Sequence, residues 1–252
     1  MRTLALFTIA LAGCTQLLGL DNLHQNTNGA DATILEDGAS LDGASGPSIK
    51  ISGKATFFSV LQLAEQPAAG AMIELLRVGD ETVVTSTTAD DMGAFSFTIP
   101  AGSDVMLRST FGLAPVALLL PSAPPTADAD FSFTMFSDEA LTQTGAVCPG
   151  NPNGIDKQRG QVFVFVADAS NTPQAGYRIT SDHAGELTCY LGGGGSTTTT
   201  QGSAIVFDVI PTLNAVTASG AANDPPVRSR AWTIPAHSQS FIRLEVPPLP
   251  QP

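Results

Sequence analysis

The sequence predicts an all-β protein made of two β-sandwiches in tandem, and three observations lead to this prediction. Glycine (24 residues) and proline (18) are frequent in the 252-residue chain, as in proteins whose short strands are joined by many turns. Apolar and polar residues alternate over short stretches, whereas long helical periodicity is not evident. Similar stretches also recur about one small domain apart. The hydrophobic content of 43% is enough for a substantial core.

The charge of the chain limits its partners. Charged residues make up only 13%, against about 25% in an average globular domain. Eleven Lys and Arg face 23 Asp and Glu, which gives a net charge of −12. A surface of this sign repels phosphate backbones, so we expect no nucleic-acid partner. We interpret the acidity as a feature that keeps an exported protein soluble.

The first segment has the features of a secretory signal. Arg2 precedes the apolar stretch Leu4–Leu11, which is far shorter than the about 20 residues of a transmembrane helix. Two small residues and Cys14 follow, and the resulting "LAGC" resembles the lipobox of bacterial lipoproteins. In that family the signal is cut just before a cysteine whose sulfur carries diacylglycerol. The resemblance implies a signal peptide over residues 1–13 and lipidation at Cys14.

The residues after Cys14 predict a tether and an address. Asn22–Pro47 is rich in Asn, Asp, Gly and Ser, a composition that buries too little to become ordered. Residues 14–47 are therefore expected to form a lipidated N-terminus and a flexible acidic tether. The residue after the cysteine is Thr15 and not Asp. By resemblance to the best-known sorting rule of bacterial lipoproteins, in which Asp at this position retains the protein in the inner membrane, Thr15 favours the outer membrane. The expected location is the cell envelope, with the membrane contacted through the lipid.

Residues 48–137 are expected to form the first sandwich. In "GAFSFTIP" the apolar Phe95, Phe97 and Ile99 alternate with small polar residues, so they share one face of a strand that ends at Pro100. The other expected strands lie in "IKISGKATFF", "AMIELLRV", "ETVVTSTT", "DVMLRST" and "DFSFTMF".

Residues 138–252 are expected to form a second, divergent sandwich. In "GQVFVFVAD" (Gly160–Asp168) the valines lie on one face of the strand and Phe163 and Phe165 on the other. A strand that is apolar on both faces is expected to be central and covered on both sides. Further strands are expected in "AGYRIT", "ELTCYL", "SAIVFDVIP", "AVTAS" and "FIRLEV".

The two regions share short sequence matches in the same order. "PAAGAMI" (Pro67–Ile73) and "PQAGYRI" (Pro173–Ile179) agree in four of seven positions at an offset of 106 residues (173 − 67). "GAFSFTIP" and "GSAIVFDVIP" follow them in turn. This spacing is that of one small sandwich domain and predicts an internal repeat.

The first region also carries a longer motif. The residues that make up its DxxGxFxFxIPxG pattern are Asp90, Gly93, Phe95, Phe97, Ile99, Pro100 and Gly102. The pattern resembles the carboxypeptidase regulatory-like, or transthyretin-like, domain over Ser48–Ser137 and, less closely, over Gly160–Pro247. The resemblance implies seven-stranded Greek-key (immunoglobulin-like) sandwiches, often in tandem on exported bacterial proteins. In the second region Tyr177 replaces the small residue that is usual in the family.

Two cysteines remain beside Cys14. Cys148 and Cys189 form an even pair in a protein expected outside the reducing cytoplasm, which favours a disulfide. The alternative is a zinc site, but no further ligands lie at a usable spacing.

Four residues are candidate metal ligands. Intradiol dioxygenases, which have a similar sandwich, bind iron through two Tyr and two His, and the corresponding residue types here are Tyr177, Tyr190, His183 and His237. That family carries closely spaced histidines, which this chain lacks, so we interpret the set as coincidental. No cofactor or metal is expected.

The sequence therefore favours a non-enzymatic structural, adhesive or binding module of the cell envelope. Its partner is expected to be a protein or a polysaccharide. One alternative is a metal-dependent enzyme, or an enzyme accessory, of the dioxygenase type. The other is a carbohydrate-binding module in which Trp232 and Tyr190 stack on sugars; Trp232 in "RSRAWTIP" is expected in the core or at its rim.

Overall fold

The computed structural model describes residues 47–61, 64–148, 155–183, 187–192, 195–220 and 225–247. The predicted signal peptide, the lipidation at Cys14 and nearly all of the predicted tether lie outside these residues. The described chain consists of strands and one helix, which confirms the all-β prediction. None of its helices is long and apolar enough to cross a membrane.

The first sandwich comprises nine strands and is followed by a helix. The strands are β1 (Ser48–Phe58), β2 (Glu65–Pro67), β3 (Met72–Arg77), β4 (Val83–Thr88), β5 (Ala94–Pro100), β6 (Val105–Thr110), β7 (Val116–Leu120), β8 (Ala129–Asp130) and β9 (Phe133–Phe136). The helix is α3 (Asp138–Ala146).

The second sandwich comprises nine further strands. They are β10 (Gly160–Ala167), β11 (Arg178–Ser181), β12 (Leu187–Tyr190), β13 (Ser203–Val209), β14 (Leu213–Asn214), β15 (Val216–Ser219), β16 (Val227–Arg228), β17 (Trp232–Thr233) and β18 (Ser238–Glu245).

The strand pairings of the first sandwich recur in the second. β1 pairs antiparallel with β5 and parallel with β9, as β10 pairs antiparallel with β13 and parallel with β18. In the opposite layer β3 pairs with β6 and β6 with β7, as β11 pairs with β15 and β15 with β16. The structure is therefore a tandem of two sandwiches with a repeated topology.

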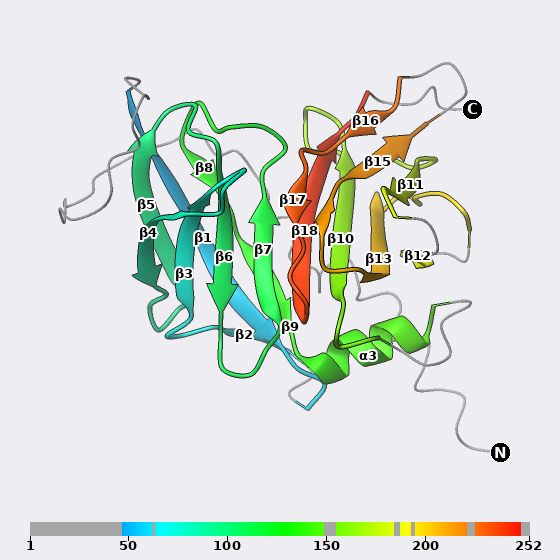
Figure 1. Cartoon of the computed structure of the whole chain (residues 1–252), viewed down its shortest axis with the longest axis horizontal. Helices are drawn as coiled ribbons and strands as arrows, with labels where there is room; N and C mark the ends of the chain where they lie inside the picture. Colours follow the sequence, from blue (N-terminus) through cyan, green and yellow to red (C-terminus); the bar gives the residue numbers. More distant parts are fainter. Residues whose placement is uncertain are drawn as a thin grey trace.

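One sheet runs through both sandwiches. Its strand order is β12-β13-β10-β18-β7-β6-β3-β4, and the junction is the parallel pair β18–β7, in register from Ser238–Val116 to Ile242–Leu120. In Figure 1 this sheet spans the width of the molecule, with β7 and β18 side by side at its centre. The junction joins one layer of each sandwich. The remaining layers lie on opposite faces of the shared sheet, because the two cores use opposite faces of it.

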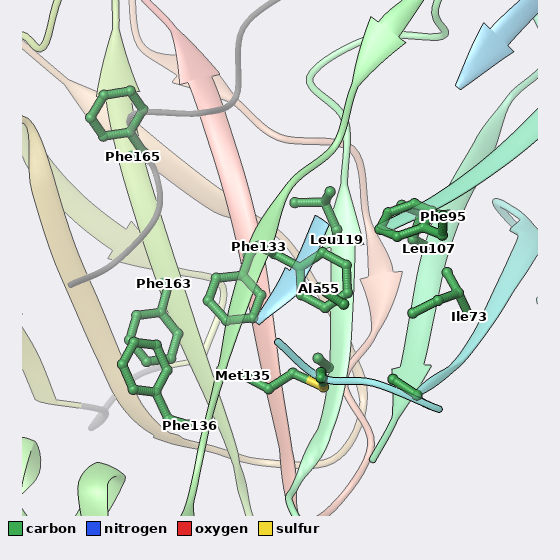
Figure 2. Close-up of a cluster of buried hydrophobic side chains, with 14 of the residues drawn as sticks. Ala55, Ile73, Phe95, Leu107, Leu119, Phe133, Met135, Phe136, Phe163 and Phe165 are labelled. Atoms are coloured by element: carbon green, nitrogen blue, oxygen red, sulfur yellow. The ribbon is translucent and has the colours of Figure 1, made fainter. Parts of the chain in front are cut away.

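The first core lies between the shared sheet and the five-stranded sheet around β1. Alternate residues of β5 point into it, as the sequence predicts: Phe95, Phe97 and Ile99 are buried and the residues between them are exposed. The aromatic core also crosses between the sandwiches. Phe136 stacks on Phe163 with ring centroids 5.2 Å apart, and Figure 2 shows these two rings together. Phe163 also stacks on Phe241, with ring centroids 5.0 Å apart.

The second core lies on the other face of the shared sheet, under β11, β15, β16, β14 and β17. It contains Val162, Val164 and Val166 of β10, whereas Phe163 and Phe165 of the same strand belong to the first core. All eight residues of β10 are buried. The prediction of a central strand covered on both faces is confirmed.

Two local features show how the sequence determines a turn and the start of a helix. Gly93 has a φ of +75°, and a Cβ there would collide with the carbonyl oxygen of Ala55, so this turn of the DxxG motif requires glycine. Helix α3 was not expected from the sequence. It begins because the Ser137 side chain accepts a hydrogen bond from the Ala140 N–H and Asp138 lies in its first turn.

Candidate functional site

The two cysteines form a disulfide, as the sequence predicts. Cys148 follows helix α3 and Cys189 lies in β12, with their Cα atoms 5.8 Å apart. Both side chains belong to the first core. The bond fastens the helix to the edge strand of the shared sheet, and since both sulfurs are used in it, the zinc alternative is wrong.

The structure does not bring the four candidate metal ligands together. Tyr177 is buried in the second core and its hydroxyl donates to the Pro247 carbonyl. His237 precedes β18 and lies against helix α3, where its Nε2 is 2.8 Å from Asp138 Oδ1. Tyr190 and His183 line the same groove, whereas His237 lies apart from both. The described residues contain no group of three or more His, Cys, Asp and Glu that could hold a metal ion.

Tyr190 and His183 belong to an open groove of about 550 Å³ at the end of the second sandwich. The groove lies between β11, β12 and β13 and the segment 195–197. Its lining residues are Arg178, Ile179, Thr180, Ser181, His183, Thr188, Tyr190, Gly195, Ser196, Thr197 and Val206. Most of the polar ones carry hydroxyl groups, and none of these described residues is acidic.

Tyr190 holds β11 in place beside this groove. β11 pairs with β15 on one side only. On the groove side the Tyr190 hydroxyl accepts from the Ile179 N–H at 2.9 Å and donates to the Ile179 carbonyl at 3.4 Å. Burial raises the pKa of Tyr190, and the hydrogen bond from Ile179 offsets this only in part. The phenol is therefore neutral near pH 7 and acts as both donor and acceptor.

The charged residues at the groove differ in whether they form an ion pair. Asp182 is bound through both carboxylate oxygens to Arg228, each at 2.6 Å, and this guanidinium holds the pKa of Asp182 below its usual range. His183 Nε2 lies 3.3 Å from the Leu213 carbonyl. Arg178, by contrast, forms no ion pair with any carboxylate of the described residues.

Arg178 and the hydroxyl residues of the groove were not predicted from the sequence. A signal for them existed in the repeat itself. At the offset of 106, Tyr177 and Arg178 stand where the first sandwich has Ala71 and Met72. These substitutions place an aromatic and a cationic side chain at the start of β11.

Trp232 is not available as a sugar-stacking surface. It is 2% exposed, and its indole N–H donates to Ser240 Oγ at 3.2 Å in the second core. The prediction of a core position is confirmed, and the alternative in which Trp232 stacks on a carbohydrate is wrong.

A smaller cavity of about 260 Å³ lies where the two sandwiches meet. Arg230 at its wall donates to the Pro121 carbonyl and forms an ion pair with Asp104. Burial lowers the pKa of Arg230. Both contacts join the second sandwich to loops of the first, so this arginine has a structural role.

Comparisons with known proteins give only a distant likeness. No protein-family model and no curated protein matches the chain. The shaft pilin SpaA from Lactobacillus rhamnosus GG is similar at a TM-score of 0.28 and 10% identity, over 81% of this chain and 100% of that one. The TIE protein of Bacillus anthracis matches at 0.26 and 11%, over 79% and 35%. The major pilin RrgB of Streptococcus pneumoniae matches at 0.28 and 8%, over 78% and 48%. TM-scores this low carry no inference about function.

Proposed function

We propose that this chain is a lipid-anchored protein of the bacterial cell envelope that acts as a non-enzymatic binding or adhesive module. The observation that carries the proposal is the continuous eight-stranded sheet, which makes the two sandwiches one body. Such a body suits a protein that holds a binding surface at a distance from its anchor. The rigid junction is reinforced by the stacked Phe136, Phe163 and Phe241.

The location is supported by two independent features. The "LAGC" sequence resembles a lipobox, and a lipidated cysteine with several acyl chains binds a membrane firmly, since each buried CH₂ contributes about 0.8 kcal/mol. The Cys148–Cys189 disulfide is of the kind that persists in oxidising compartments. Thr15 after the cysteine favours the outer membrane.

The binding role is supported by the groove at β11 and β12. Its hydroxyls, the Tyr190 phenol and the Arg178 guanidinium are groups that recognise a ligand through hydrogen bonds. Among the described lining residues His183 alone carries an imidazole, and its Nε2 is within hydrogen-bonding distance of a main-chain carbonyl.

The location is tested by labelling and fractionation in a bacterium with two membranes. We expect the full chain to incorporate labelled palmitate and to sediment with the outer membrane. Cys14→Ser should lose both, and Thr15→Asp should move to the inner membrane while keeping the label. Thr15→Ser is the matched control. A wild-type chain that carries no acyl label would refute the anchor.

The non-enzymatic role is tested on the full chain purified in detergent without chelators. We expect neither iron nor zinc at a stoichiometric level by elemental analysis. Iron or zinc near one per chain would refute the proposal and favour the metal-enzyme alternative.

A further inference from the structure

We propose that the groove between β11 and β12 binds an acidic polysaccharide, whose sugar carboxylates are held by Arg178. The inference rests on the proposed function, because it names the ligand class of a binding module. It is carried by the charge, the hydrogen-bonding groups and the main-chain contacts of the groove.

The groove is a cationic site on an acidic protein. The chain has a net charge of −12, yet none of the described residues that line the groove is acidic. The six other arginines of the described residues each form an ion pair with a carboxylate. Arg178 alone among them has no such partner there. Asp182 does not supply one, because both of its oxygens are bound to Arg228.

A carboxylate is a better partner for the Arg178 guanidinium than a neutral group is. The planar guanidinium presents a fork of N–H donors that matches the two oxygens of a carboxylate. Because the net charge of −12 repels a polyanion at long range, binding of an acidic polysaccharide depends on the local contact with Arg178.

The remaining lining favours a sugar over a peptide. An extended peptide would be expected to add to the edge of β11 through main-chain hydrogen bonds. Much of that edge is already occupied: the Tyr190 hydroxyl bonds both main-chain groups of Ile179. Thr198 bonds the main-chain N–H and carbonyl of Tyr177. Little of the edge is left for a peptide strand, which favours recognition of the ligand by side chains.

Those side chains suit a saccharide. Thr180, Thr188, Ser196 and Thr197 offer hydroxyls that both donate and accept, as sugar hydroxyls do, and Val206 adds an apolar contact for C–H groups. The volume of about 550 Å³ lies within the range of about 300–1,000 Å³ that is typical of small-ligand sites. An open groove of this size accommodates a segment of a longer chain.

The test measures binding by the full chain purified in detergent. The probes are polygalacturonate and alginate as acidic polysaccharides, pullulan as a neutral one, and poly-glutamate as an acidic peptide. We expect both acidic polysaccharides to bind and the other two not to bind. Arg178→Gln should weaken binding about tenfold or more, as expected for a hydrogen bond to a charged group. Lys54→Gln is the matched control, because it removes another cation that forms no ion pair in the described residues.

Three outcomes would overturn the inference. Binding that is the same in Arg178→Gln and in the wild type would place the site elsewhere. Binding of poly-glutamate that depends on Arg178 and is at least as tight would make the ligand class an acidic peptide. Failure of both acidic polysaccharides to bind would refute the ligand class. None of these results alters the acyl label or the metal content, which test the proposed function separately.

Discussion

Gln239 offers the sharpest test of the single body formed by the two sandwiches. It lies in β18, is fully buried, and reaches across the junction to the first sandwich. Its Oε1 accepts from the Phe136 N–H at 2.9 Å, and its Nε2 donates to the Pro115 carbonyl at 3.1 Å and to the Phe136 carbonyl at 3.3 Å. Gln239→Met keeps a side chain of similar length and removes all three bonds.

The magnitude follows from the groups left without a partner. One buried N–H and two carbonyls lose their bonds to Gln239, and each unsatisfied buried group costs about 1–3 kcal/mol. The 3.3 Å bond is the weakest, so we expect the free energy of unfolding to fall by about 3–5 kcal/mol. Gln66→Met, at an exposed position in β2, is the control and should change it by less than about 0.5 kcal/mol.

The assay is urea unfolding followed by two probes. Trp232 is the only tryptophan of the chain and its fluorescence reports on the second core, whereas far-ultraviolet circular dichroism reports on all strands. Because the sheet is continuous, both probes should show one coincident transition in the wild type. Two separate transitions, together with a change of less than about 1 kcal/mol in Gln239→Met, would show that the sandwiches fold independently and that these bonds contribute little.

Three further predictions concern stability. Replacing both Cys148 and Cys189 by Ser should lower the free energy of unfolding by about 4 kcal/mol, the loop-closure value for a separation of 41 residues, as measured in urea; an unchanged midpoint would refute this. Burial raises the pKa of Asp138, but the hydrogen bonds from its two basic neighbours outweigh it, so the pKa is lowered in the folded state. The contribution of Asp138 to the free energy of unfolding is thus present above the unfolded pKa of about 3.9 and is lost as the pH falls through the folded pKa. The difference in this free energy between wild type and Asp138→Asn should therefore shrink in acid, and a difference that grows would refute the argument. Gly102→Ala, at a φ of +80° in open space, should cost about 1–2 kcal/mol, whereas Gly93→Ala, at a similar φ but blocked by backbone, should cost clearly more by thermal unfolding; equal costs would refute the steric argument.

The alternation of apolar and polar residues was enough to predict which strands bury one face and which bury both. The pattern in β5 placed Phe95 and Phe97 in a core, and the doubly apolar pattern in β10 placed it at the centre of a sheet. Both predictions depend only on the two-residue period of a strand, which is a local property. The disulfide was predictable for a similar reason, because it needed only the number of cysteines and the expected compartment.

The junction could not be predicted in the same way. The pairing of β7 with β18 joins residues more than a hundred positions apart, and nothing in the sequence of either strand specifies a partner. β7 is apolar on both faces, which is compatible with many neighbours, and β18 begins with the polar Ser238, Gln239 and Ser240, which do not suggest a strand buried at a junction. Helix α3 was missed for a different reason. Its nine residues are too few for a periodic pattern, although the capping Ser137 and the acidic first turn were present.

The candidate site lies at a place where the two sandwiches differ in topology. In the first, β4 pairs with β3 and extends that layer. In the second, the strand in the corresponding position, β12, pairs with β13 in the opposite layer instead. The edge of β11 is consequently left without a strand, and the Tyr190 hydroxyl and Thr198 take over its main-chain groups. The groove is the space opened by this change of layer, and Arg178 stands at its start, where the first sandwich has Met72. A repeat whose copies had kept identical pairings would have a strand covering the edge of β11, so the divergence of the second copy is what creates the groove.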